Sequence, residues 1–373
     1  MLPWIDRRAF LRKLTEGVFF ATVARWLPLR PGIAEAAPIE PGAGVSRIVS
    51  VYNPHATDQS GGKDNENLNA DIVQDMVDQA ILAFTGHSTV KAAWEEVIPD
   101  PSRKVAIKIN CQITGVFTKA KVVQPIIDGL LQRGVPADNI IIYDMRDTAF
   151  DYAGFKKNLG PGVKVGTVSD FGGYARFLFT RLANLLTGGY RNSIYNYLGE
   201  LERTSSWGLV RSVSRGMLGD TERPFDCEYL INVPVLKALD GYSGVTLSMK
   251  NHYGSIGNPA DHHDDIMDHI PLVNNLPQIK KKTRLIVLDA IYAEYKWVNG
   301  RDQRYVAVVN KILVGRDPVA IDYTGWQMLE RLRREHEVGP ICPHPAFIAK
   351  AAKMGLGVDD PTKIEYVEIG KSV

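Results

Sequence analysis

The segment that decides the fold is residues 230–269, LINVPVLKALDGYSGVTLSMKNHYGSIGNPADHHDDIMDH. It opens with an apolar run over 229–235 that predicts a buried strand. A loop of Gly, Ser and Asp follows, carrying Lys237, Asp240, Tyr242, Ser243 and Thr246, and then comes Lys250-Asn251-His252. Ligand sites in open α/β sheets lie in the crevice beyond the carboxyl ends of the strands. We therefore expect the functional site in this segment.

Apolar runs and segments of helical periodicity alternate along the rest of the chain. Strands are expected at 48–52, 105–109, 140–143, 163–168, 285–288, 306–309, 311–314 and 364–369. Helices are expected at 70–84, 89–97, 119–132, 317–334 and 345–354. This alternation predicts a single α/β domain with a mostly parallel sheet flanked by helices.

Residues 171–222 interrupt the alternation with arginines and aromatic residues. We expect an inserted helical segment here. Four alternatives are open for this segment: a packed insertion with solvated arginines, a lid over the site, a surface for a protein partner, or an interfacial membrane patch.

The N-terminus predicts export. DRRAFLR at residues 6–12 matches the twin-arginine pattern, an apolar run follows at 17–24, and Ala34-Glu35-Ala36 offers a cleavage site. We therefore expect residues 1–36 to be a signal peptide recognised by the twin-arginine translocase, and residues 37–373 to reach the periplasm folded. A basic amphipathic helix or an uncleaved anchor is the alternative. The apolar run is too short to span a bilayer, which needs ~20 residues.

Composition excludes several classes of function. The 373 residues are 45% hydrophobic and 23% charged with a net charge of +2, as in soluble globular proteins, so bulk charge does not indicate a nucleic-acid partner. Cys111, Cys227 and Cys342 form no CxxC pair and no iron–sulfur binding run, and their disulfide state stays open. The motifs of ordinary dehydrogenases, NTPases, serine hydrolases and zincins are absent from the sequence.

A cluster of His and Asp is the candidate metal site. Asn258 and Pro259 predict a helix start, and on such a helix His262, Asp265 and His269 share one face within about 60° at 3.6 residues per turn. This is a plausible half-site for Zn²⁺, Fe²⁺ or Ni²⁺, to which His252 could add a ligand. The alternative is a solvated helix face.

Lysines and strand-end polar residues indicate an anion site. Lys237, Lys250 and Asn251 suit a phosphate or carboxylate, with Ser243 and Thr246 in the adjoining turn. A lysine paired with a structural acid is the alternative. Three further residues directly follow predicted strands and could face the same rim, or could instead cap helices: Asn110, Asp144 and Asp289.

These residues carry a resemblance to a known family. The matching pieces, in order, are KVAIKIN at 104–110, NVPVLK at 232–237, GVTLSMKNHYG at 244–254, LDA at 288–290 and DPVAID at 317–322. Together they resemble the family named domain of unknown function 362, outside residues 171–222. Members carry either a ferredoxin-type module or a twin-arginine leader. This chain has the leader without the cluster cysteines, so the resemblance implies no iron–sulfur cluster of its own.

The resemblance implies a shared fold but supplies no reaction, and it points to Lys237, Thr246, Lys250, Asn251 and Asp289. The run from Lys237 through the GYSG turn to Lys250 is also similar to the cofactor loop of nickel-pincer lactate racemases, although the spacing to the second lysine differs.

The function expected from these observations is a periplasmic enzyme, related to redox chemistry by its family. Lys237, Lys250, Asn251 and Asp289 would be its catalytic residues, and a small anion its ligand. Asn110, Asp144, Ser243 and Thr246 would bind a cofactor, and the histidine cluster a divalent metal. The alternative is a non-catalytic binding or accessory protein, such as a metal carrier or an assembly partner of a redox complex.

Overall fold

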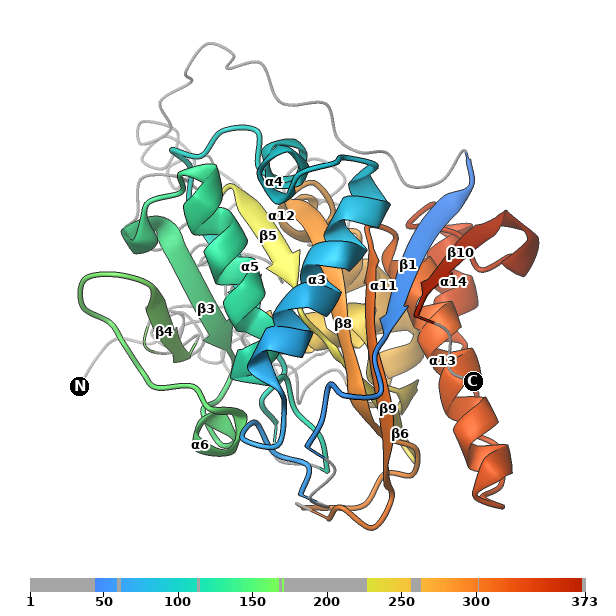
Figure 1. The fold of residues 1–373 in the computed structure, drawn as a ribbon. Coiled ribbons are helices and arrows are strands. Elements are labelled where there is room, and N and C mark those ends of the chain that lie inside the picture. The colour runs from blue at the N-terminus through green and yellow to red at the C-terminus, as the bar shows by residue number, and fades with distance from the viewer. Residues whose placement is uncertain are drawn as a thin grey trace, which may run out of the picture. The chain divides into compact units, whose positions relative to one another are not determined.

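A ten-stranded mixed sheet forms the centre of this computed structural model (Figure 1). The structure describes residues 44–58, 62–112, 115–167, 170, 227–255, 263–300 and 302–370. The main path of the sheet has the order β10-β1-β9-β8-β5-β2-β3-β4, with β6 paired to β8 and β7 to β6. The strands are β1 Ser46–Tyr52, β2 Val105–Lys108, β3 Ile140–Asp144, β4 Lys164–Thr167, β5 Tyr229–Asn232, β6 Val235–Leu239, β7 Gly244–Val245, β8 Thr283–Glu294, β9 Val306–Gly315 and β10 Ile364–Ile369.

Most strand pairs are parallel. The neighbours β8-β5-β2-β3-β4 all pair in parallel, as do β1 with β10 and β6 with β8. Strand β9 runs antiparallel to both β1 and β8, and β7 antiparallel to β6. The predicted single α/β domain with a mostly parallel sheet is confirmed.

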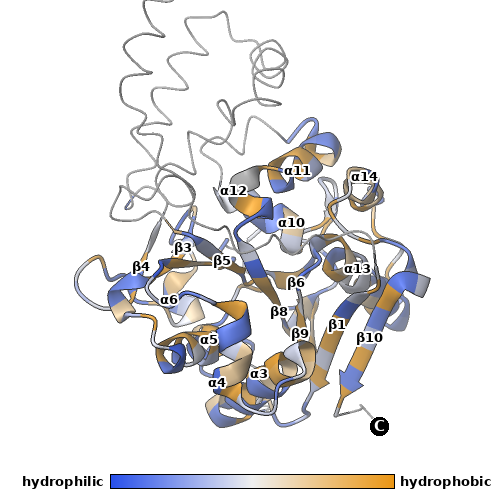
Figure 2. Ribbon diagram, turned by 90° about the horizontal axis from the view of Figure 1, so that it is seen from above, coloured by the Kyte–Doolittle hydropathy of each residue, from blue (hydrophilic) through white to orange (hydrophobic). Residues whose placement is uncertain are grey.

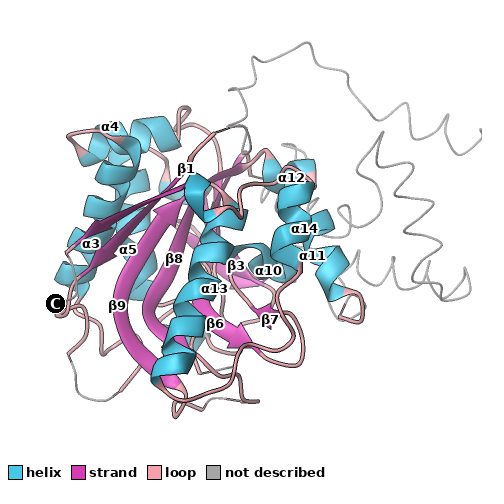
Figure 3. Ribbon diagram, turned by 90° about the vertical axis from the view of Figure 1, so that its right-hand side faces the viewer, coloured by secondary structure: helices cyan, strands magenta, loops and turns pink. Residues whose placement is uncertain are grey.

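Helices cover both faces of the sheet. They are α3 Ala70–Thr85, α4 Val90–Val97, α5 Ala120–Arg133, α6 Phe150–Ala153, α10 Ser248–Asn251, α11 Ile266–Asn274, α12 Pro277–Lys280, α13 Pro318–Glu335 and α14 Phe347–Lys353, with 3-10 turns at Ala137–Asn139, His252–Ser255 and Pro361–Lys363. Helices α3, α4 and α5 lie on one face, and α10, α11, α13 and α14 lie on the other (Figures 2 and 3).

Two apolar cores separate these layers, because side chains alternate along each strand. In β8, Val287 packs in the core beneath α3 and α5, whereas Leu288 packs in the core beneath α13. Both faces of the central strands are therefore buried, as expected for parallel strands between helical layers.

Short local signals set the helix ends. The Asn69 side chain accepts a hydrogen bond from the backbone of Ile72 at the start of α3. Asp317 does the same for Val319 and Ala320 at the start of α13, where Pro318 is the first helical residue. Helix α3 ends at Gly86, which has a φ of 75° that favours glycine.

Three strands differ from the prediction. The run at 229–235 is two strands, and β6 extends to Leu239, so Lys237 lies in a strand and not in a loop. Strand β8 has 12 residues, because it pairs with β5, β6 and β9 along its length. The two predicted strands at 306–314 are one strand, interrupted only by Asn310 at a φ of 53°.

Two predicted segments, the signal peptide at 1–36 and the insertion at 171–222, lie outside the described residues. Within the described part of the chain, no helix has the length and apolarity needed to cross a membrane. All three cysteine thiols are free: Cys111 and Cys227 are buried, and Cys342 is exposed.

Candidate functional site

The crevice beside β2 is where the site begins. Strand β2 lies between β3 and β5. The chain runs from β2 to β3 and β4 on one side, and later returns as β5 on the other side. Such a reversal opens a crevice at the carboxyl ends of the strands, where ligands bind. Lys108, Asp144 and Asn232 end β2, β3 and β5 at this edge.

A buried ion pair forms the floor of the crevice. The Lys108 Nζ lies 2.6 Å from Asp144 Oδ1, and both side chains are at most 2% exposed. Asp144 also accepts hydrogen bonds from the backbone N–H groups of Cys111 at 2.6 Å and Met145 at 2.7 Å. Lys108 further donates to the carbonyl of Ile109. Both charges are thus paired and hydrogen-bonded, as buried charges require.

A chain of amides connects this floor to a second lysine. Lys108 Nζ and Asn110 Nδ2 both donate to Asn251 Oδ1 at 3.1 Å, and Asn251 Nδ2 donates to Asn232 Oδ1 at 2.7 Å. Lys237 Nζ donates to Asn110 Oδ1 at 2.9 Å. The network leaves each amide one orientation, so Lys237 is held at the crevice by a fixed acceptor.

Lys250 differs from the other two lysines. Its side chain is buried and lines the crevice, and its Nζ lies 4.0 Å from the centre of the Tyr253 ring. Within the described part of the chain, the Lys250 ammonium has no hydrogen bond and no ion pair. Burial, together with the charges of Lys237 and Lys108, lowers the pKa of Lys250 to about 7. Burial also lowers the pKa of Lys237 to about 8, against the raising effect of Glu294.

The three lysines border a cavity of about 330 Å³, within the size range of small-molecule sites. Its lining residues include Lys108, Lys237, Lys250 and Arg146, against a single acid, Asp144. The cavity also has an aromatic wall of Tyr253, His263 and Trp297, and Tyr242 packs edge-on against the Trp297 ring at 5.4 Å. The cavity therefore offers surplus positive charge beside flat apolar surface.

Helix α10, which carries Lys250 and Asn251, is held from behind. The Asp322 carboxylate accepts hydrogen bonds from the backbone N–H groups of Ser248 at 2.7 Å and Met249 at 3.0 Å. Beyond the helix, a Cβ on Gly254 would lie 2.5 Å from Asp144 Oδ1 and 2.7 Å from Lys108 Nζ. Only glycine lets the chain approach the ion pair this closely.

Six of the residues predicted to bind or catalyse line this cavity: Asn110, Asp144, Lys237, Thr246, Lys250 and Asn251. Two others do not. Asp289 lies inside β8 and accepts hydrogen bonds from the backbone of Lys119 and Ile291, so it supports the start of α5 and is not at a strand end. Ser243 donates to the Val245 carbonyl at 2.7 Å and stabilises its own turn.

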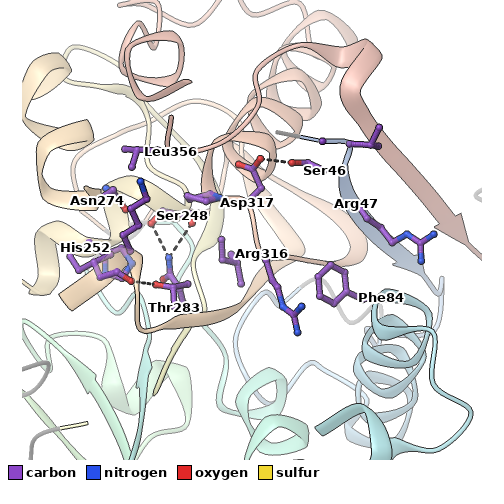
Figure 4. A pocket seen from close by; sticks show the side chains of 17 residues that line it. Ser46, Arg47, Phe84, Ser248, His252, Asn274, Thr283, Arg316, Asp317 and Leu356 are labelled. Atoms are coloured by element: carbon purple, nitrogen blue, oxygen red, sulfur yellow. Dashed lines mark hydrogen bonds between the residues drawn. The ribbon is translucent and has the colours of Figure 1, made fainter. Parts of the chain in front are cut away.

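The predicted metal half-site is not assembled by its described members. His252 lines a second cavity of about 360 Å³ beside Ser248 and Asn274 (Figure 4). Asp265 is exposed, whereas His269 is buried with its Nδ1 3.1 Å from the Tyr253 hydroxyl. The described residues contain no group of three His, Cys, Asp or Glu side chains able to hold a metal ion.

The predicted helix start at Asn258 lies outside the described residues. Helix α11 begins at Ile266 with Asp265 as its N-cap and continues through Pro271 to Asn274. His262 lies outside the described residues, and its part in a metal site stays a prediction. Burial lowers the pKa of His252 to about 3, which keeps this imidazole neutral.

Several site residues were missed, although some left a signal in the sequence. Lys108 and Asn232 are polar residues within otherwise apolar strands, a pattern that indicates a buried polar network. Asp322 was missed because an acid one turn into a helix carries no signal in the sequence for a distant partner. Gly254, Tyr253 and Trp297 depend on tertiary packing that no local pattern reports.

Comparison with known proteins gives one match. Residues 221–327 match the family described as Domain of unknown function (DUF362). This range contains β5, β6, α10 and Asp322, and thus Lys237, Lys250 and Asn251. No curated protein and no solved structure matches the chain.

Proposed function

We propose that this chain, which belongs to the DUF362 family through residues 221–327, is an enzyme that binds a small anionic substrate in the cavity at the carboxyl ends of β2, β3 and β6. The observation that carries the proposal is Lys250. It is a buried lysine that faces a cavity and, within the described residues, makes no ion pair and no hydrogen bond, only the contact with the Tyr253 ring.

Charge and geometry favour an anion. The positive charge of Lys108 is neutralised by Asp144, while Lys237 donates a hydrogen bond to the neutral Asn110 amide and is acted on by the charge of Glu294. A carboxylate or phosphate would supply the counter-charge for Lys250 and a further acceptor for Lys237, and charge-assisted hydrogen bonds are the strong ones. The Asn110 and Asn251 amides and the Thr246 hydroxyl lie on the same lining and can orient the ligand.

Lys250 also supports catalysis over simple binding. With a pKa of about 7 it changes protonation near neutral pH, which suits a general acid or base. A binding protein would need only a permanently charged ammonium. The burial of Lys250 against Tyr253 destabilises the charged form of the lysine, and such shifted pKa values are concentrated at catalytic sites.

Isothermal titration with oxalate and with inorganic phosphate tests the proposal. We expect binding to the full-length protein that weakens about tenfold or more in Lys250→Met and in Lys237→Met, because a hydrogen bond to a charged group contributes about 1.5–3 kcal/mol. The exposed Lys91→Met is the matched control and should bind as the wild type does. Equal binding by all four proteins, or none by the wild type, would refute the anion site.

Export to the periplasm is a further proposal, supported by the twin-arginine motif at residues 6–12. Cell fractionation of the wild type and of a variant with both arginines changed to lysine tests it. The wild type should appear in the periplasmic fraction, and the variant should not. A redox reaction stays a prediction from the family resemblance.

A further inference from the structure

Lys250 is also a candidate for covalent chemistry. We propose that its amine forms an imine with the carbonyl carbon of a small 2-oxo acid or of another anionic aldehyde or ketone. This inference rests on the proposed function, since it places the acid group of the ligand at the anion site described above.

The first argument is the contrast between the three lysines. Lys108 donates to a carboxylate, an amide and a carbonyl, so its ammonium protons are all engaged. Lys237 is held by Asn110. Lys250 alone among them has only an aromatic ring beneath its nitrogen, at 4.0 Å, among the contacts of the described residues. A neutral amine can leave this ring without breaking a hydrogen bond.

The second argument is the surroundings of the amine. A lysine becomes nucleophilic when burial and neighbouring cations favour its neutral form. Both conditions hold here, because the Lys250 side chain is buried and the Lys108 and Lys237 ammonium groups lie close enough to lower its pKa. Of these two cations, Lys237 would bind the carboxylate of a 2-oxo acid, which holds the adjacent carbonyl beside the amine.

The reaction balances with water as the only by-product. The lone pair of Lys250 Nζ attacks the carbonyl carbon, the C–N bond forms, and the proton lost from nitrogen passes to the carbonyl oxygen to give a carbinolamine. Protonation of its hydroxyl releases water and leaves a C=N bond. Lys237 is a candidate donor on the lining, since with a pKa of about 8 it is largely protonated at pH 7.

The aromatic wall suits the rest of such a substrate. Tyr253, His263 and Trp297 line the cavity together with the lysines. A planar imine conjugated to a carboxylate, or an apolar substituent on the carbonyl, would lie against these rings at little cost in desolvation. A neutral aldehyde would gain the same apolar contacts but no attraction to the cations.

The test uses three matched probes on the full-length protein: glyoxylate, which has both groups, acetaldehyde, which lacks the acid, and oxalate, which lacks the reactive carbonyl. Each carbonyl probe is incubated at pH 7.5 and the imine is reduced with cyanoborohydride, after which peptide mass spectrometry locates the adduct. We expect glyoxylate to modify Lys250 at least about tenfold faster than the exposed Lys91, because an ordinary lysine with a pKa of ≈ 10.4 is almost fully protonated at this pH. Acetaldehyde should prefer Lys250 less strongly than glyoxylate does, because it has no acid group to be held by the cations, and oxalate should suppress the Lys250 adduct.

Two outcomes would overturn the inference in distinguishable ways. If oxalate binds by calorimetry but glyoxylate modifies Lys250 no faster than Lys91, the imine is refuted and the anion site stands. If neither binding nor selective modification occurs, both fail. Lys250→Arg is the variant control: it keeps a cation and should still bind oxalate, but it cannot form the adduct. Because the adduct is mapped on the wild type, a folding defect in this variant would not obscure the result.

Discussion

Replacing Lys250 with methionine should stabilise the protein, although it removes a proposed catalytic residue. The pKa of Lys250 falls from its usual 10.5 to about 7 in the folded chain. A difference of this size corresponds to about 5 kcal/mol, at about 1.36 kcal/mol per unit. This is an upper bound for the destabilisation caused by the buried charge, and we expect Lys250→Met to recover about 2–4 kcal/mol at pH 6.5, since buried sites relax.

The gain should depend on pH in a defined direction. Below pH 7 the lysine is charged in both folded and unfolded chains, so the unfavourable contribution is present in full. Between pH 7 and 10.5 the unfolded chain binds the extra proton, and the stability of the wild type therefore rises with pH. The advantage of Lys250→Met should shrink by about 2–3 kcal/mol between pH 6.5 and 9.

Thermal unfolding followed by circular dichroism measures this. With an unfolding entropy of about 2.1 cal/mol/K per residue, the expected gain at pH 6.5 is roughly 3–6 °C. Lys119→Met is the matched control. Lys119 is also buried, but its Nζ donates to the Phe117 carbonyl and its charge acts on Asp289, so its removal should lower the melting temperature. A lower melting temperature in Lys250→Met, or a gain independent of pH, would refute the reasoning.

The remaining predictions concern the frame of the site. Binding of oxalate should weaken between pH 6.5 and 9 as Lys250 and then Lys237 lose their protons. Calorimetry at four pH values would check this, and binding that strengthens with pH would contradict it. Gly254→Ala should lower the free energy of unfolding by about 1–3 kcal/mol and abolish oxalate binding, because the added Cβ would meet the Lys108–Asp144 pair. Unchanged binding would show that this ion pair can move to make room. Asp322→Asn should lower the free energy of unfolding by about 1–3 kcal/mol, because one amide oxygen replaces the two carboxylate acceptors and leaves a buried N–H of α10 unpaired. Denaturant unfolding measures this, and an unchanged midpoint would contradict it.

The fold was largely readable from the sequence because its signals are local. Alternating apolar runs and helical periodicity located the sheet and the layers, and Asp317-Pro318 marked the start of α13. The errors came where tertiary contacts extend an element. Strand β6 continues to Leu239 because it pairs with both β7 and β8.

The candidate site was readable in part for a similar reason. Lys237, Lys250 and Asn251 follow a buried strand, and topology alone brings such residues to one edge. What could not be read is how the charges pair. The sequence does not reveal that Asp144 neutralises Lys108 while Lys250 faces only Tyr253, and this difference sets the chemistry. Asp289 was misplaced because β8 continues well past it.

The most direct test of the anion site is the reactivity of Lys250 itself. Trace acetylation of the full-length protein with acetic anhydride at pH 7.5, read by peptide mass spectrometry with and without oxalate, compares Lys250 with the exposed Lys91. We predict that Lys250 reacts faster than Lys91 and that oxalate slows Lys250 alone, because a neutral amine at the anion site is both nucleophilic and covered by the ligand. A Lys250 that reacts more slowly than Lys91, or at a rate that oxalate does not change, would contradict the proposed site.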